Sequence, residues 1–184
     1  MMFHSKIDEN IELRLLEERH ANEVFGLLVK NRSHLQAELT WLTDQLTFED
    51  AREYIRAGLE RMAANNGLRA GIWLHDDLAG IVSLHGVVWA DRKASLGYWL
   101  GEPFQGQGLV AKACGSLINH AFGELDLNRL EIQCDSENAR SRKVAERLGF
   151  TLEGILRQAW WSQGRFVDEA VYGLLKSEWH GTAT

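Results

Sequence analysis

The fold is decided by residues 98–111, which read Tyr98-Trp99-Leu100-Gly101-Glu102-Pro103-Phe104-Gln105-Gly106-Gln107-Gly108-Leu109-Val110-Ala111. A strand pattern ends here, two glycines follow one residue apart, and an apolar helical pattern begins at once. Glycine allows a backbone to approach a ligand closely, and the free N–H groups of a helix N-terminus favour an anion such as pyrophosphate. The spacing alone leaves a plain glycine-bearing turn open beside a phosphate-binding loop.

Two other phosphate-binding loops are excluded by the residues that follow this segment. No Gly-Lys-Ser/Thr comes after Gly108, as a Walker loop requires, and the third glycine of the dinucleotide pattern is absent. The strand before the loop also belongs to a meander, because residues 69–75, 78–89 and 94–101 have strand patterns joined by short turns.

The rest of the chain predicts further strands and helices on both sides of this meander. Residues 11–15 alternate as in a half-buried strand, and two amphipathic helices follow, with a short helix and a loop expected at residues 31–45. After the loop we expect a helix from Gly108, a strand at 128–134, a helix at 139–148 and a hairpin of 150–161 and 165–175 that turns at Gln163-Gly164. A strand–helix–strand crossover beside a meander predicts a mixed α/β sheet with helices on its faces.

The composition is that of one soluble globular domain, with 184 residues, 45% hydrophobic and 25% charged. A net charge of −6 disfavours general nucleic-acid binding, although a local basic patch could bind one anionic ligand. Cys114 and Cys134 lack metal-ligand spacing, so we expect no metal site and two reduced, buried cysteines in a cytoplasmic protein. Neither a signal peptide nor an apolar stretch of about 18 residues is found, so no membrane segment is expected.

Two motifs together resemble the GNAT superfamily of acetyl-CoA-dependent N-acetyltransferases. The family's pyrophosphate loop reads Gln/Arg-x-x-Gly-x-Gly/Ala, which Gln105 to Gly108 match, whereas Val110 stands where glycine or alanine is usual. The strand Glu131-Ile132-Gln133-Cys134, the Asn138 that follows it, and Leu148-Gly149-Phe150 after the next helix are similar to a second family pattern. The resemblance extends from about residue 11 to residue 179.

Within the superfamily the sequence looks closest to the RimL-like and RimJ-like ribosomal-protein N-terminal acetyltransferases. The motifs are Gly97-Tyr98-Trp99-Leu100, Asn138-x-x-Ser141, Phe150-x-x-Glu153-Gly154 and Gly164-x-x-x-Asp168. This implies a single GNAT domain over residues 1–184, with its core at about 11–179. The sheet would be mixed, mostly antiparallel and seven-stranded, with helices on both faces and a splay between the fourth and fifth strands.

The resemblance also implies acetyl-CoA as co-substrate, direct transfer to a primary amine in a ternary complex, and no metal. The residues implied to bind acetyl-CoA are Trp99, Leu100, Gln105, Gly106, Gln107, Gly108, Leu109, Val110, Ala111, Asn138, Ser141 and Lys143. Asn138 would bond the pantetheine arm, Ser141 would donate a proton to the sulfur, and a backbone N–H near Leu100 would stabilise the oxyanion. A plain helix cap for Asn138 and a solvent-exposed role for Ser141 are the structural alternatives.

The general base is the open role in this interpretation. Many relatives carry an acid in the stretch that here reads Gln158-Ala159-Trp160-Trp161. His85 is the catalytic candidate by its ordinary pKa of about 6.5, although a lone strand histidine is more often structural. Glu102, Asp135 and water are the other candidates.

The expected acceptor is a protein N-terminal α-amine, as in the acetylation of ribosomal proteins. The alternatives are a small-molecule amine (an antibiotic, a polyamine or an aminoacyl-nucleotide) and a non-catalytic module that binds acyl-CoA. Trp41, Trp160 and Trp161, three of the seven tryptophans, are expected to line the acceptor cleft, with core or dimer contacts as the alternative for each. The resemblance leaves a homodimer open.

Overall fold

The structure is a computed structural model that describes residues 3–36, 39, 41–162 and 164–181. Parts of two predicted segments lie outside the described residues. These parts are residues 37, 38 and 40 of the expected short helix and loop, and Gln163 of the expected hairpin turn.

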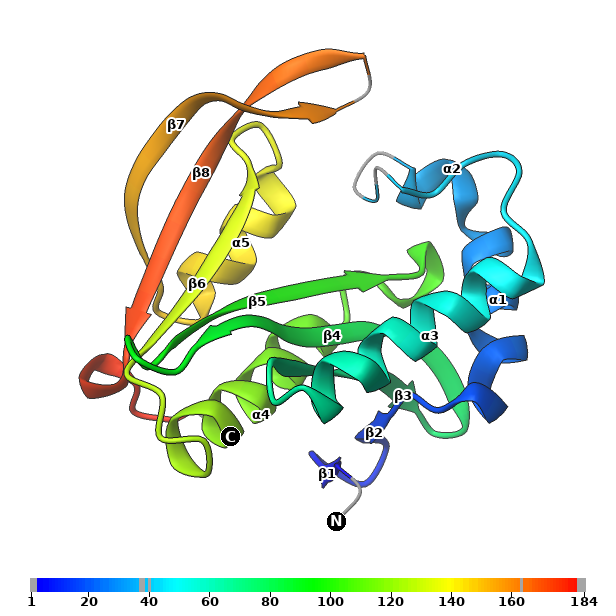
Figure 1. Ribbon diagram of the computed structural model, residues 1–184, viewed down its shortest axis with the longest axis horizontal. Helices are drawn as coiled ribbons and strands as arrows, with labels where there is room; N and C mark the ends of the chain where they lie inside the picture. Colours follow the sequence, from blue (N-terminus) through cyan, green and yellow to red (C-terminus); the bar gives the residue numbers. More distant parts are fainter. Residues whose placement is uncertain (1–2, 37–38, 40, 163, 182–184) are drawn as a thin grey trace.

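The described chain forms one eight-stranded sheet with helices on both of its faces (Figure 1). The strands are β1 (His4–Lys6), β2 (Ile11–Leu15), β3 (Gly67–Leu74), β4 (Asp77–Val88), β5 (Lys93–Leu100), β6 (Arg129–Asp135), β7 (Thr151–Ser162) and β8 (Arg165–Leu175). The helices are α1 (Ala21–Lys30), α2 (Arg32–Leu35), α3 (Phe48–Ala63), α4 (Leu109–Gly123) and α5 (Ala139–Arg147). Three short 3-10 helices are η1 (Glu18–His20), η2 (Glu102–Phe104) and η3 (Lys176–Glu178).

The strands lie in the order β1-β2-β3-β4-β5-β6-β8-β7. Neighbouring strands are antiparallel except β5 and β6, which are parallel, so the predicted mixed and mostly antiparallel sheet is confirmed. The sheet has eight strands rather than the expected seven. The additional strand, β1, pairs with β2 over only three residues, too few to show a readable alternation in the sequence.

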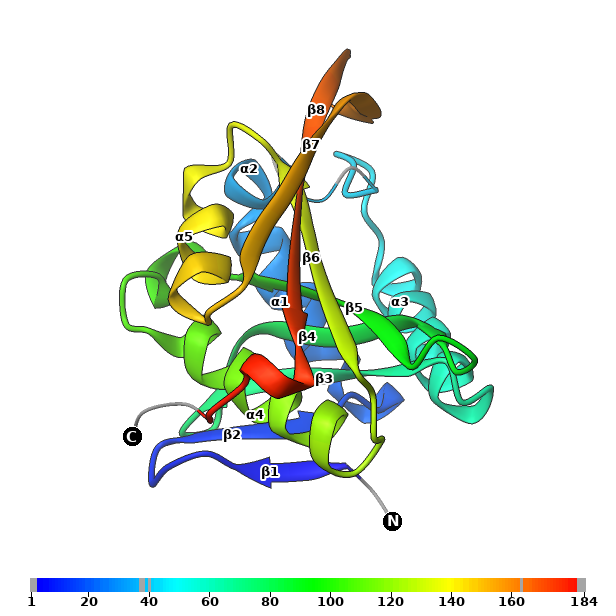
Figure 2. The same cartoon turned by 90° about the vertical axis from the view of Figure 1, so that its left-hand side faces the viewer.

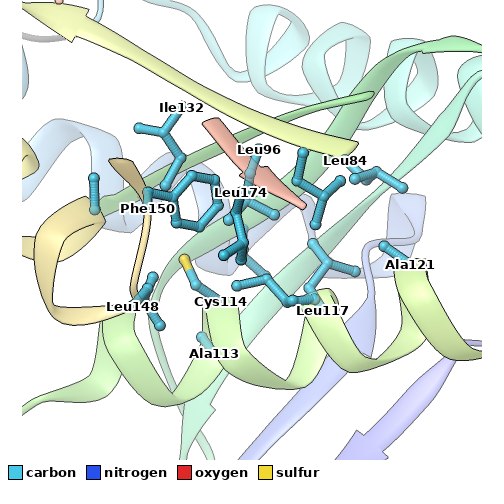
Figure 3. Close-up of a cluster of buried hydrophobic side chains, with 14 of the residues drawn as sticks. Leu84, Leu96, Ala113, Cys114, Leu117, Ala121, Ile132, Leu148, Phe150 and Leu174 are labelled. Carbon is cyan, nitrogen blue, oxygen red and sulfur yellow. The ribbon is translucent and has the colours of Figure 1, made fainter. Parts of the chain in front are cut away.

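The apolar core lies on both faces of the sheet. On one face, α4 and α5 cover side chains such as Leu84, Leu96 and Leu174, and Figure 3 shows Cys114 and Leu117 of α4 packed among them. Helices α1 and α3 lie on the other face (Figure 2). They cover a second cluster of buried apolar side chains, which includes Leu28, Ile55 and Ile81. Cys114 and Cys134 are both buried, as expected. No helix in the described ranges is long and apolar enough to span a membrane.

The sheet parts between β5 and β6, as predicted. The two strands pair only from Lys93 opposite Arg129 to Ser95 opposite Glu131, and then diverge (Figure 1). On the other side of β5, the Gly101 N–H donates to the Ala79 carbonyl at 2.9 Å. Because peptide groups alternate in direction along a strand, the N–H of Leu100 points away from β4 and into the opening.

Candidate functional site

One cleft of about 700 Å³ lies between the end of β5, the loop after it, the start of α4 and one side of α5, and we call it the loop cleft. Except for Gln107, every residue expected to bind acetyl-CoA lines this cleft. Gln107 is exposed and donates its Nε2 to the Pro103 carbonyl at 3.2 Å. The sequence therefore located one continuous surface, formed by elements far apart along the chain.

The loop between β5 and α4 depends on two glycines in the left-handed region. Gly106 has φ 75° and Gly108 has φ 74°. A Cβ at either position would meet nothing within 4 Å, so the backbone conformation, and not crowding, favours glycine. No side chain caps α4 at Gly108, and its first turn contains no acidic residue. The free N–H groups at this helix start therefore suit an anion.

Cations from α5 lie beside this helix start. Arg140, Lys143 and Arg147 all line the loop cleft. The Arg140 guanidinium donates to Gln105 Oε1 at 3.2 Å, and the Gln105 amide lies 2.6 Å from His34 Nε2. The cleft thus combines backbone N–H groups with basic side chains, which is the donor set that binds phosphate groups.

Ser141 lies at the start of α5 and is hydrogen-bonded to Tyr98 on β5. The Tyr98 hydroxyl lies 3.0 Å from Ser141 Oγ and donates to the Ser141 carbonyl at 3.2 Å. Asn138 caps α5, because its Oδ1 accepts from the Ser141 N–H at 3.0 Å, and it also lines the loop cleft. Asn138 is therefore a helix cap, which is its structural alternative, and it also lines the loop cleft.

A second cleft of about 250 Å³ opens between β5 and β6, and we call it the strand cleft. It shares Tyr98, Trp99, Asn138 and Ser141 with the loop cleft, so these four residues form a common wall. A ligand in the loop cleft and a second ligand in the strand cleft would meet at this wall.

The expected acceptor tryptophans separate into two groups. Trp41 and Trp160 line the strand cleft. Trp161 is absent from its lining, is 57% exposed, and packs edge-on against Phe166 with ring centroids 4.8 Å apart. Because Trp160 and Trp161 are adjacent on β7, their side chains point to opposite faces of the strand.

The wall of the strand cleft next to α3 is a stack of three side chains. Trp41 stacks on Tyr54 with centroids 4.8 Å apart, and the Arg69 guanidinium lies 3.7 Å from the centroid of the Tyr54 ring. The Tyr54 hydroxyl accepts from Trp99 Nε1 at 3.2 Å. No local pattern in the sequence marks Tyr54 and Arg69 as site residues, because the contacts of Tyr54 with Arg69 and Trp99 join residues 15 and 45 positions apart.

The candidates for the base lie in different places. His85 is half-buried on β4 beside Gly97, where a Cβ would lie 3.2 Å from His85 Cε1, and it does not line either cleft. Burial lowers the pKa of His85, and the charges of Arg61 and Arg69 lower it further. Glu102 is exposed in η2.

Asp135 is the carboxylate in the lining of the strand cleft. Its Oδ1 accepts from the Glu137 N–H at 2.8 Å. Glu169 of β8 lies opposite Asp135 in the sheet, and burial raises the pKa of Glu169. In the described part of the chain, no three His, Cys, Asp or Glu side chains are grouped so as to hold a metal ion.

Comparison with known proteins gives one consistent family. Residues 10–151 match the family model described as acetyltransferase (GNAT) domain. YdaF of Bacillus subtilis (strain 168) is 38% identical over 181 residues, which cover 98% of this chain and 99% of that protein. The ribosomal-protein-serine acetyltransferase of Escherichia coli (strain K12) is 32% identical over 167 residues, with 91% and 93% covered.

Solved structures agree with the sequence relatives. RimL, described as a ribosomal L7/L12 alpha-N-protein acetyltransferase, was solved in complex with coenzyme A that is joined to one of its cysteines by a disulfide. It superimposes on this chain with a TM-score of 0.90 at 29% identity, covering 94% of this chain and 98% of that one. The sheet, its parting and the helices are therefore arranged as in that protein.

Proposed function

Because the chain belongs to the GNAT acetyltransferase family, we propose that it transfers the acetyl group of acetyl-CoA to a protein N-terminal α-amine, with a ribosomal protein as the expected acceptor. The observation that carries this proposal is the wall shared by the loop cleft and the strand cleft. It allows a thioester and an amine to enter from two sides and meet beside Ser141. Two similar proteins bear names that describe acetylation of ribosomal proteins.

The loop cleft fits coenzyme A by the chemistry of its donors. The uncapped start of α4, with Gly106 and Gly108 before it, would hold the pyrophosphate. Arg140, Lys143 and Arg147 would attract the 3′-phosphate, so we expect the affinity for coenzyme A to weaken with added salt. The pantetheine arm would lie along the peptide groups of β5, where this strand diverges from β6.

The reaction requires one bond to form and one to break. The acceptor nitrogen attacks the thioester carbonyl carbon, the new C–N bond forms, the C–S bond breaks, and the sulfur keeps the electron pair. The Leu100 N–H would donate to the carbonyl oxygen as it gains negative charge. The Ser141 hydroxyl would donate a proton to the departing sulfur and recover one from water. The Tyr98 hydroxyl, 3.0 Å from Ser141 Oγ, would orient Ser141 for this transfer.

The amine must also lose a proton. Asp135 lines the strand cleft, so we propose it as the side chain that attracts the ammonium and passes its proton to water. His85 stays a candidate only by way of water, because its ring packs against Gly97, which lines the strand cleft, but does not line the cleft itself. An α-amine has an ordinary pKa of about 7.7–8.0, so a strong base is not required.

We propose a single GNAT domain that works in the cytoplasm without a metal and without nucleic acid. The β7–β8 hairpin projects from the body of the molecule (Figure 1) and exposes Trp161, Phe166 and Leu156, which supports a homodimer through this hairpin.

The test is release of the coenzyme A thiol with panels of amines. We expect release with peptides that have a free N-terminus and none with the same peptides acetylated at the N-terminus. Ser141→Ala is expected to lower kcat about 100-fold. Release with only polyamines, aminoglycosides or aminoacyl-adenylate analogues would instead identify a small-molecule acceptor. Coenzyme A binding with no release for any amine would identify a non-catalytic module.

A further inference from the structure

Arg69 places a buried positive charge in the strand cleft. The residue is only 9% exposed, yet it lines the cleft beside Ser83 and Gly97. Its Nη1 donates to the Tyr54 carbonyl, and its guanidinium lies over the Tyr54 ring. Its Nε is buried and has no hydrogen-bond partner in the described part of the chain.

No carboxylate of the described residues forms an ion pair with Arg69. Burial lowers the pKa of Arg69, but arginine stays protonated in proteins, so the charge persists. A buried charge without a counter-charge is costly for a fold. The Tyr54 ring and carbonyl offset part of that cost, and an anionic group in the cleft would offset the rest.

The charges of the strand cleft are arranged on opposite walls. Arg69 belongs to β3 and is opposite Ser83 of β4, while Asp135 belongs to β6, across the parting of the sheet. Trp41 and Tyr54 supply the apolar wall between the cleft and α3. An acceptor with an ammonium at one end and a negative group further along would match both walls.

We propose that Arg69 selects acceptors that carry a carboxylate near the reactive amine. This inference rests on the proposed function, and in a protein acceptor the carboxylate is an aspartate or glutamate among the first residues. A polyamine would instead place a second cation against Arg69, which like-charge repulsion opposes. Arg69 would therefore determine specificity and would not take part in the transfer of the acetyl group.

The experiment compares peptides of equal length that differ in one residue. Each has a free N-terminal serine and carries aspartate, asparagine or lysine at its second, third or fourth position, and spermidine is included. For the wild-type protein we expect kcat/KM to fall from aspartate to asparagine to lysine at one of these positions. The range from aspartate to lysine should be about 10- to 100-fold, as for a hydrogen bond to a charged group.

Arg69→Met should remove this preference by raising KM for the aspartate peptide, with little change in KM for acetyl-CoA. Arg69→Lys should keep part of it, because the charge remains and the planar donors are lost. Arg19→Met is the matched control, since that guanidinium is 67% exposed, lies on η1 and should leave the preference intact. Thermal unfolding and coenzyme A affinity show whether each variant is folded.

Each outcome decides the proposal. Equal kcat/KM for the aspartate and lysine peptides in the wild-type protein would overturn it, as would a preference that survives in Arg69→Met. If Arg69→Met does not fold, the wild-type series and Arg69→Lys still decide. Failure of every peptide to release thiol would reject the proposed function and this inference with it, whereas transfer without a charge preference would reject only the inference.

Discussion

The Tyr98 hydroxyl lies 3.0 Å from Ser141 Oγ and so joins the strand on one side of the loop cleft to the helix on the other. The loop that follows Tyr98 can be recognised in the sequence, because its two glycines and the helix start after them are local patterns. The contact between Tyr98 and Ser141 cannot be predicted from the sequence, because it joins residues 43 positions apart and depends on how α5 packs.

Replacing Tyr98 by phenylalanine tests this contact. We expect Tyr98→Phe to lower kcat about tenfold, the effect of losing one hydrogen bond, with KM for acetyl-CoA nearly unchanged. In combination with Ser141→Ala it should lower kcat little further, because the contact with Ser141 Oγ is already lost and only the bond to the Ser141 carbonyl remains to be removed. Steady-state kinetics of the two single variants and the double variant measure this.

Tyr172→Phe provides the matched control for that experiment. Tyr172 is fully buried, and its hydroxyl also contacts α5, accepting from Arg142 Nε at 2.9 Å and donating to Glu146 Oε1 at 3.1 Å. Its loss should lower stability and leave kcat unchanged. An equal loss of kcat in both variants would mean that Tyr98 only anchors α5.

Helix α3 carries Tyr54, whose side chain lines the strand cleft. The first turn of this helix is held by reciprocal hydrogen bonds between Thr47 and Asp50. Thr47 Oγ1 accepts from the Asp50 N–H at 3.2 Å, and the Asp50 carboxylate accepts from the Thr47 N–H at 2.6 Å. The Thr47 N–H and the Thr47 hydroxyl both donate to the Asp50 carboxylate, and these two bonds hold the pKa of Asp50 below its usual value. A threonine followed three residues later by a carboxylate is a capping-box pattern that can be recognised in the sequence itself.

Thr47→Ala should therefore lower the free energy of unfolding by about 1 kcal/mol, the usual cost of losing an N-cap side chain. Urea denaturation followed by circular dichroism measures the change. Thr43→Ala, an exposed threonine in the preceding loop, serves as control and should stay near the wild-type value. Equal effects of the two substitutions would contradict the role of the cap.

Elements were predictable where their patterns were long, and the exceptions have physical reasons. The second strand of the closing hairpin has the bounds expected from its alternation, whereas β1 is too short for any pattern. In β7 the register shifts between Leu156 and Trp160, and Gln158 has φ 50°. No glycine marks that bulge, so the sequence did not show which of the two tryptophans would enter the cleft.

The stability of the whole molecule should depend on pH through two half-buried histidines, His85 and His20. Burial lowers the pKa of His85 and of His20 below the ordinary value of about 6.5. The unfolded chain therefore binds protons that the folded one does not, and stability falls as the pH falls below about 6.5. The contribution of each histidine is complete above that pH.

His85→Gln should flatten this dependence, because glutamine has no proton to gain. Urea midpoints measured from about pH 7.5 to pH 5.5 should fall less steeply in the variant than in the wild-type protein. His20 keeps part of the slope in both proteins. Burial raises the pKa of Glu169, so this residue makes stability fall as the pH rises. Its effect is the same in the variant and in the wild-type protein, so it cancels in the comparison. Identical slopes would show that His85 titrates normally in the folded protein.

An ordinary open sheet has two edges, and the parting of β5 from β6 gives this one two more, in its interior. Unpaired strand edges tend to recruit other strands, and proteins usually shield them with charges, bulges or covering helices. Here the inner edges line the strand cleft, which an acceptor has to enter under the proposed function, so no other part of the chain can cover them permanently. We therefore expect a ligand bound along β5 to cover these unpaired backbone groups and so to protect them from pairing with strands of other molecules.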